Sequence, residues 1–287
     1  MHLGNVWSAL LAWLSVRAVD GEMILRIEDL DSYRCRPEYA SQIREDLHWL
    51  GLDWDWEQPC QSTRTDAYAA TFQSLLSRGL VYPCYCSHAD LHAASAPHTS
   101  DGRLLYDGRC RRLTPSQRKA SEKPPAWRLI VPAHEFLLYD GLQGHFSEQL
   151  ARDCGDFIIR RSDGIYAYQL AVVVDDAAGG VNQVVRGRDL LESTPRQLYL
   201  YKLLGKEPPS FYHVPLLLAP DNRRLSKRNR DLDLGELRKR YTPEQIIGKL
   251  AVLAGLISEG ETVSAKELIS LFSWNRIPKE DIVLDVF

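Results

Sequence analysis

The chain has 287 residues, of which 45% are hydrophobic and 25% are charged, a composition typical of a folded globular protein and not of a disordered one. No apolar run reaches the roughly 18 residues that span a bilayer, and the apolar start lacks the leader and cleavage site of a secretory signal. We therefore expect no membrane contact and a cytoplasmic location. The formal net charge of −3 argues against a uniformly basic nucleic-acid binder, but it leaves a locally basic face open.

Helical and strand patterns alternate over residues 1–81. Hydrophobic spacing predicts a helix over 3–19, and the run EMILRIEDLD after Gly21 predicts a strand that ends in carboxylates. Helical spacing returns over 38–50 and 64–79. This alternation is typical of a doubly wound α/β domain, and we assign 1–81 to its first half.

The composition changes between residues 82 and 125. This stretch holds three cysteines and the run AASAPHTSDG, so we interpret 82–125 as an inserted module with a loop at its centre. Three strand-like segments follow, DFIIRRSDG, YAYQLAVVVDD and VNQVVRG, and the run LAVVVDD predicts a buried parallel strand. TPRQLYLYKLLG predicts a helix. The second half of the domain therefore spans 126–231, and 232–287 is expected to be mostly helical.

The inserted module has thiols that suit a metal ion. Cys84 and Cys86 are separated by one residue, and Cys110 follows in the same module. Three thiolates can hold one Zn²⁺ in a sulfur-rich tetrahedral site, for which imidazole is a common fourth ligand. The residues alone leave three candidates for it, His88, His92 and His98. Buried free thiols without metal are the alternative. No role is assigned to Cys35, Cys60 and Cys154.

Two short motifs combine features that bind phosphate. His2, Gly4 and Asn5 stand at the start of the first helix, where an imidazole and backbone N–H groups meet the positive end of the helix dipole. In RRLSKRN, Ser226 and Lys227 lie in a basic loop, and a lysine there can neutralise charge that develops on phosphate. The alternatives are a helix start with an exposed histidine and a solvated basic loop.

Together the two motifs resemble the HIGH and KMSKS signatures of class I aminoacyl-tRNA synthetases. The blocks LRIEDLDSYR, GDFIIRRSDGIYAYQLAVVVDD and VVRGRDLLESTPRQ are similar to blocks of the glutamyl branch. A discriminating glutamyl-tRNA synthetase would carry a large anticodon-binding region after its KMSKS loop. The short region after residue 231 and the Cys-x-Cys pattern therefore make the chain similar to the glutamyl-Q tRNA(Asp) synthetases.

This resemblance implies a Rossmann-like class I catalytic domain with an inserted zinc-binding module and a short helical C-terminal region. It implies that ATP, with Mg²⁺, activates L-glutamate to glutamyl-adenylate, and that glutamate passes to the queuosine base in the anticodon loop of tRNA(Asp). The implied partners are ATP, L-glutamate and the anticodon stem-loop of tRNA(Asp). We expect a monomer with a structural Zn²⁺.

The resemblance also implies roles for single residues. His2 and Lys227 would act in catalysis, and ATP would contact His2, Gly4, Asn5, Ser226 and Lys227. The fourth zinc ligand beside the three cysteines would be Tyr106, in YDGRC, instead of a histidine.

Three residues would form the glutamate pocket, namely Glu28, Tyr168 and Arg186. The carboxylate of Glu28 matches an α-ammonium, and the guanidinium of Arg186 matches a carboxylate. Without the resemblance, each has an ordinary interpretation. Glu28 would cap a turn, Arg186 would pair with Asp175 or Asp176, and Tyr168 would belong to the core.

Two other functions stay open at this stage. One is the catalytic part of a discriminating glutamyl-tRNA synthetase, and the other is a non-catalytic zinc-bearing protein that binds tRNA. Backbone contacts to tRNA are available to two arginine clusters, Arg109, Arg111 and Arg112, and Arg223, Arg224, Arg228 and Arg230. Whether glutamate activation needs tRNA would separate a glutamyl-Q tRNA(Asp) synthetase from a discriminating glutamyl-tRNA synthetase.

The start of the chain gives a further expectation. The resembling enzymes carry a first strand and loop, with an Arg and a Ser of the amino-acid pocket, ahead of the segment that corresponds to His2–Asn5. We therefore expect the true start to lie upstream of Met1. A genuinely shortened protein is the alternative, and N-terminal sequencing of the native protein distinguishes the two.

Overall fold

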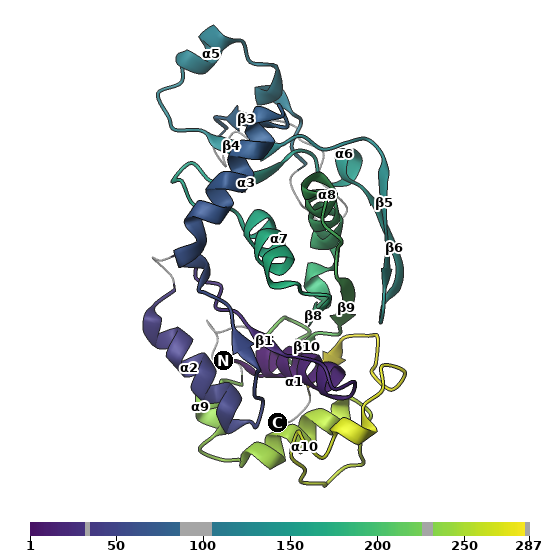
Figure 1. The fold of residues 1–287 in the computed structure, drawn as a ribbon. Helices are drawn as coiled ribbons and strands as arrows, with labels where there is room; N and C mark the ends of the chain where they lie inside the picture. Colours follow the sequence, from purple (N-terminus) through teal and green to yellow (C-terminus); the bar gives the residue numbers. More distant parts are fainter. Residues whose placement is uncertain (32–34, 87–104, 226–231, 285–287) are drawn as a thin grey trace.

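The computed structural model describes residues 1–31, 35–86, 105–225 and 232–284, and it is a mixed α/β protein (Figure 1). Its central part holds two parallel strand pairs. β1 (Ile24–Leu25) pairs with β2 (Trp56–Glu57), and β8 (Gln183–Gly187) pairs with β9 (Ser210–Val214). Over the described ranges, no helix combines the length and apolarity needed to cross a membrane.

Helix α1 (Leu3–Arg17) forms the middle of the largest core. Leu3, Leu10 and Leu14 are fully buried, and the same cluster includes Ile246 and Leu250 of α10 (Pro243–Leu253). Figure 1 shows α1 between the parallel strands and the C-terminal helices. Most of the helix is buried or half-buried and only Asn5 is exposed, which explains why the segment is mostly apolar.

We expect Leu10→Ala to lower the free energy of unfolding by about 2–5 kcal/mol, because it removes a buried side chain and leaves a cavity. Val19→Ala is the matched control, since Val19 is 73% exposed just beyond the same helix and should cost less than about 0.5 kcal/mol. Urea denaturation followed by circular dichroism measures both. Equal losses in the two variants would contradict the burial of α1.

A groove separates the two parallel pairs. Leu25 of β1 and Val184 of β8 line the same cavity of about 720 Å³, and Ala12 and Val16 of α1 also line it. In the part of the chain that the structure describes, β1 and β8 each pair with one neighbouring strand.

The expected parallel strand at LAVVVDD is wrong. Residues Tyr168–Gly179 form helix α7, which ends at Gly180 in the left-handed conformation (φ 65°). An uninterrupted apolar run suits a buried strand or a buried helix equally well, so periodicity does not separate them. A helix satisfies its own backbone hydrogen bonds, and α7 can therefore lie in the core against α3 (Thr65–Ser77) and α8 (Thr194–Leu204) without a partner strand.

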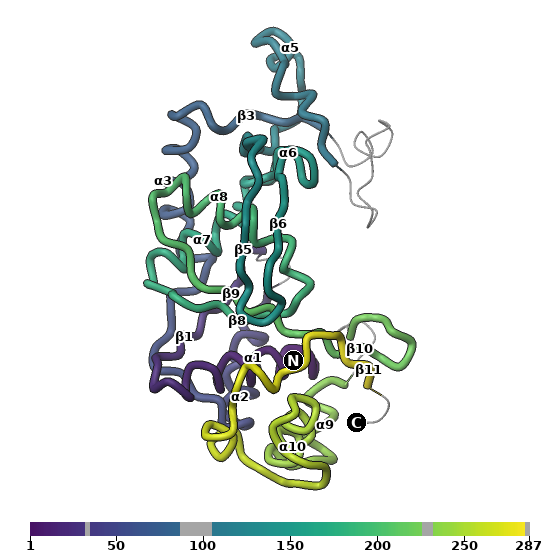
Figure 2. The backbone as a smooth tube through the Cα atoms, turned by 90° about the vertical axis from the view of Figure 1, so that its right-hand side faces the viewer, coloured from purple at the N-terminus to yellow at the C-terminus, as the bar shows by residue number. Residues whose placement is uncertain are grey.

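The other elements lie around these layers. The antiparallel sheet β3 (Val81–Cys84), β4 (Ala126–Leu129) and β7 (Phe157–Arg160) lies at the end of α3. The hairpin of β5 (Glu135–Asp140) and β6 (Gly144–Gln149) runs toward β8 and β9 (Figure 2). The C-terminal region returns through β11 (Ile282–Val283) to pair with β10 (Leu217–Leu218).

The remaining elements are short, apart from α2. They are α2 (Pro37–Trp49), α5 (Pro115–Lys119), α6 (Leu150–Asp153), α9 (Leu234–Leu237), and the 3-10 turns Gln61–Arg64, Arg109–Arg112, Arg188–Ser193 and Ile269–Leu271.

Candidate active site

The start of α1 is tied to the segment that follows the basic loop. The Leu3 amide donates to the Leu232 carbonyl at 3.1 Å, and the Leu234 amide donates to the Met1 carbonyl at 2.8 Å. His2 forms a β-bridge with Asp233. The first signature therefore lies beside residues 232–234. Ser226 and Lys227 lie outside the described residues, and their roles stay predictions.

A cavity of about 420 Å³ opens at this helix start. His2, Gly4 and Asn5 line it together with Arg186 and Arg224. A Cβ atom on Gly4 would lie 3.1 Å from the His2 ring, so glycine leaves room for the imidazole there. The positive end of the α1 dipole and these cations make the cavity suitable for phosphate.

Arg186 is 9% exposed and lies at the wall of this cavity. Its Nε donates to His213 Nε2 at 3.0 Å, its Nη2 donates to Thr194 Oγ1 at 2.9 Å, and its Nη1 lies 3.4 Å from the Tyr168 hydroxyl. All of these partners are neutral. Among the described residues, Arg186 makes no ion pair with a carboxylate, which is rare for a buried guanidinium. An anion that enters the cavity can therefore bind to Arg186, a cation that has already lost most of its contact with water.

Tyr168, at the start of α7, lies close to Arg186 and also to the carboxylates of Glu28 and Asp176. Burial raises the pKa of its hydroxyl, and the charges of Arg186, Glu28 and Asp176 all act on it. Glu28 follows β1 and accepts from Arg26 Nη2 at 2.9 Å. The three residues expected at a glutamate pocket thus influence one another electrostatically.

Arg26 was not singled out from the sequence, and Asp176 was considered only as a possible partner of Arg186. Arg26 Nη1 contacts Asp176 at 2.5 Å, and Asp175 instead pairs with Arg64 and accepts from Tyr68. These pairs remove the alternative in which Arg186 is the partner of either aspartate. The signal for Arg26 was its position two residues before Glu28, because alternate residues of an extended segment share one face.

A buried Asp–His pair lies behind Arg186. His213 Nδ1 lies 2.6 Å from Asp140 Oδ2, and both side chains are fully buried. Burial opposes ionisation of Asp140, but hydrogen bonds from His213 and backbone amides outweigh it and lower its pKa. Burial lowers the pKa of His213, and the Arg186 charge lowers it further against the opposing effect of Asp140. His213 is therefore neutral at pH 7.

This lowered pKa predicts how stability depends on pH. As the pH falls below about 6.5, the ordinary pKa of histidine, the unfolded chain binds a proton that native His213 does not. We expect its contribution to stability to be complete above pH 6.5 and to be lost as the pH falls toward the folded pKa. The measurement is the difference in free energy of unfolding between the native protein and His213→Gln from pH 7.5 to 5. A difference independent of pH would contradict it.

The three cysteines of the module converge. The sulfur atoms of Cys84, Cys86 and Cys110 lie within 4.8 Å of one another, and Cys86 and Cys110 are 3.5 Å apart. The Tyr106 hydroxyl lies 3.6 Å from Cys84 Sγ and accepts from the Cys110 amide. His88, His92 and His98 lie outside the described residues.

Without a metal ion, the surroundings of this cluster favour a thiolate at Cys84 but not at Cys86. Burial opposes ionisation of Cys84, but Arg128, whose Nε is 3.3 Å from its sulfur, outweighs it and lowers the pKa of that thiol. Burial and the neighbouring thiol of Cys110 raise the pKa of Cys86 to about 12. The donor set of three sulfurs and a phenol oxygen fits a soft or borderline cation such as Zn²⁺.

Three arginines of the two basic clusters form ion pairs with exposed or half-buried aspartates. Arg109 pairs with Asp107, Arg223 with Asp221, and Arg224 with Asp189. Contacts of these arginines with tRNA stay a prediction, and Arg228 and Arg230 lie outside the described residues.

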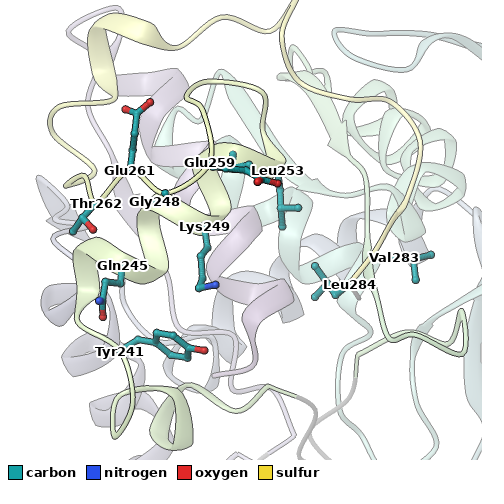
Figure 3. A pocket seen from close by; sticks show the side chains of 12 residues that line it. Tyr241, Gln245, Gly248, Lys249, Leu253, Glu259, Glu261, Thr262, Val283 and Leu284 are labelled. Carbon is teal, nitrogen blue, oxygen red and sulfur yellow. The ribbon is translucent and has the colours of Figure 1, made fainter. Parts of the chain in front are cut away.

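A separate pocket of about 630 Å³ lies in the C-terminal region (Figure 3). Tyr241 and Lys249 line it beside Glu259 and Glu261. None of the residues singled out from the sequence lines this pocket, so it is distinct from the site at α1 and Arg186.

Comparison with known proteins identifies the class. Residues 1–285 match the family described as tRNA synthetases class I (E and Q), catalytic domain. The chain therefore belongs to the class I tRNA synthetase catalytic domains of the glutamate and glutamine type, and it is a ligase-type enzyme.

The relatives are more specific. The Glutamyl-Q tRNA(Asp) synthetase of Symbiobacterium thermophilum is 48% identical, with 98% of this chain and 91% of that protein covered. The protein of the same name from Nitratidesulfovibrio vulgaris is 47% identical, with 99% and 91% covered. The resemblance to this group that the sequence predicts is thus confirmed.

Solved structures agree with this class. A glutamate tRNA ligase from Elizabethkingia meningosepticum, in complex with its amino acid, has a TM-score of 0.82 at 27% identity and covers 99% of this chain. The glutamate-tRNA synthetase of Elizabethkingia anophelis has a TM-score of 0.83 at 27% identity and covers 99% of this chain. This chain spans 64% and 66% of the length of those two ligases.

Proposed function

We propose that this enzyme uses ATP to activate L-glutamate as glutamyl-adenylate and transfers the glutamyl group to the queuosine base in the anticodon loop of tRNA(Asp). The observation that carries the activation step is buried Arg186, a cation without a carboxylate partner in the described chain, at the wall of the cavity that opens at α1. The tRNA acceptor rests on the printed name of the relatives.

Glutamate brings two carboxylates and an ammonium to this site. Arg186 Nη1 and the Tyr168 hydroxyl form a pair of donors for one carboxylate. Glu28 supplies the anion for the α-ammonium, and its ion pair with Arg26 limits the positions its carboxylate can take. These contacts would hold the reacting α-carboxylate toward the phosphate cavity.

The reaction places charge where α1 begins. An oxygen of the α-carboxylate attacks the α-phosphorus of ATP, the bond from that phosphorus to the bridging oxygen breaks, and pyrophosphate leaves. His2 and Lys227 would donate to the phosphates as negative charge moves onto the leaving group, and Gly4, Asn5 and Ser226 would contact ATP. Loss of either donor is expected to cost about 3–4 kcal/mol in the transition state.

Two metal ions are part of the proposal. Mg²⁺, bound with ATP, supplies neutralisation of phosphate charge. Zn²⁺ would be held by Cys84, Cys86, Cys110 and Tyr106, whose sulfur-rich, largely buried set fits it. Its role there would be structural, because it would join β3 to the turn at 109–112.

The test is glutamate-dependent exchange of pyrophosphate into ATP without tRNA. It is run on the 287-residue chain. Exchange supports activation of glutamate without tRNA, and the absence of exchange contradicts it. Transfer is then assayed with [¹⁴C]glutamate on tRNA(Asp) with and without queuosine, and equal labelling of both would contradict the proposed acceptor.

A further inference from the structure

Arg186 is held by an unusual set of neutral partners, and the fold explains how they meet. In the parallel pair β8–β9, Arg186 is in register with His213, so both side chains lie on one face. The hairpin turn after β5 brings Asp140 to the far side of His213. Gly141 makes this approach possible, because a Cβ atom there would lie 2.1 Å from the Tyr212 ring.

Hydrogen-bond chemistry allows one protonation state for His213. Asp140 has a lowered pKa and is an ionised acceptor, so the Nδ1 atom of His213 must donate to it. The Nε of Arg186 is always a donor, so the Nε2 atom of His213 must accept. Only the neutral tautomer with its proton on Nδ1 satisfies both contacts.

The same contacts fix which part of Arg186 is available. Nε is engaged by His213, and Nη2 is engaged by Thr194 and lies 3.5 Å from the Leu190 carbonyl. This leaves Nη1, beside the Tyr168 hydroxyl, as the part of the Arg186 guanidinium that an incoming carboxylate can contact.

We propose that Asp140 and His213 are positioning residues for carboxylate recognition. Asp140 holds His213 in the Nδ1–H tautomer, and neutral His213 holds the Arg186 guanidinium so that its Nη1 edge and Tyr168 form the binding pair. This inference rests on the proposed function, because the carboxylate in question is that of glutamate.

Two variants separate positioning from simple folding. In His213→Gln the side-chain amide reaches about as far as Nε2 and can accept from Arg186, whereas in His213→Asn the amide reaches only the position of Nδ1. We expect His213→Asn to raise the KM for glutamate about 10- to 100-fold, as for a lost hydrogen bond to a charged group, with the KM for ATP changed less than about twofold. His213→Gln should stay within about threefold of native.

The control is His145→Asn, an exposed histidine on the β5–β6 hairpin, which should leave both constants unchanged. Thermal denaturation of every variant reports folding. Equal rises in the glutamate KM for the Gln and Asn variants, or a matching rise in the KM for ATP, would overturn the positioning role.

A measurement without turnover keeps the two proposals distinguishable. ¹⁵N NMR of the histidine-labelled native protein at pH 7, with His213 assigned from its absence in His213→Gln, should show a protonated Nδ1 and an unprotonated Nε2. An Nε2–H tautomer or an imidazolium would overturn the positioning proposal even if glutamate is activated. If the expected tautomer is observed but no pyrophosphate exchange is detected, only the proposed function is contradicted.

Discussion

Replacing Arg186 by methionine is expected to lower kcat/KM for glutamate in pyrophosphate exchange by about 100- to 1,000-fold, the cost of removing one partner from a buried, hydrogen-bonded charge pair. In this variant the carboxylate of glutamate would meet no cation at the position of Arg186. The KM for ATP should change much less. Arg186→Lys should fall between the two, because lysine keeps the charge but not the Nε contact with His213.

Stability separates this effect from unfolding. Burying the guanidinium of Arg186 without a carboxylate partner costs desolvation energy in the native protein. The variant avoids this cost, which compensates for part of the hydrogen bonding that it loses. We expect the free energy of unfolding of Arg186→Met to change by no more than about 1–2 kcal/mol. Arg152→Met, in an exposed part of α6, is the control for loss of one positive charge. A kcat/KM for glutamate within threefold of native would contradict the assignment of Arg186 to the glutamate pocket.

Replacing Cys110 by serine is expected to abolish stoichiometric zinc binding. Even changes outside the ligand shell weaken metal sites by about 10- to 100-fold, and loss of a thiolate ligand should exceed that. Because metal binding free energy contributes to folding, the free energy of unfolding should also fall, by about 2–5 kcal/mol. Mass spectrometry of metal content and urea denaturation provide the two readouts.

The matched control is Cys154→Ser, since Cys154 is partly buried in a different core cluster and belongs to no group of potential ligands in the described chain. It should retain about one zinc per chain. Treatment of the native protein with a strong chelator should reproduce the destabilisation of Cys110→Ser, and a protein purified without zinc that is unaffected by chelator would contradict the site. Tyr106→Phe, which keeps the three thiols, should show an intermediate affinity.

The sequence by itself determined the elements whose signal is local. Helical spacing predicted α1, α2, α3 and α8 close to their observed ends, because i, i+3 and i+4 side chains of one segment meet without help from the rest of the chain. The strand at β8 and the short motifs around His2 and the cysteines were also readable, since they depend on residue type at fixed spacing. These motifs were enough to indicate the family.

The tertiary structure decided what depends on residues remote in the chain. LAVVVDD is a helix because packing against α3 and α8, not its periodicity, defines its surroundings. Arg186 meets Asp140 through His213 only because β5, β8 and β9 converge, and 73 residues separate that aspartate from the histidine it contacts. A buried polar group needs a hydrogen-bond partner, but which residue becomes that partner depends on the fold and not on the residues adjacent in the sequence. The sequence therefore determined which chemical groups are present, and the fold decided which of them face one another.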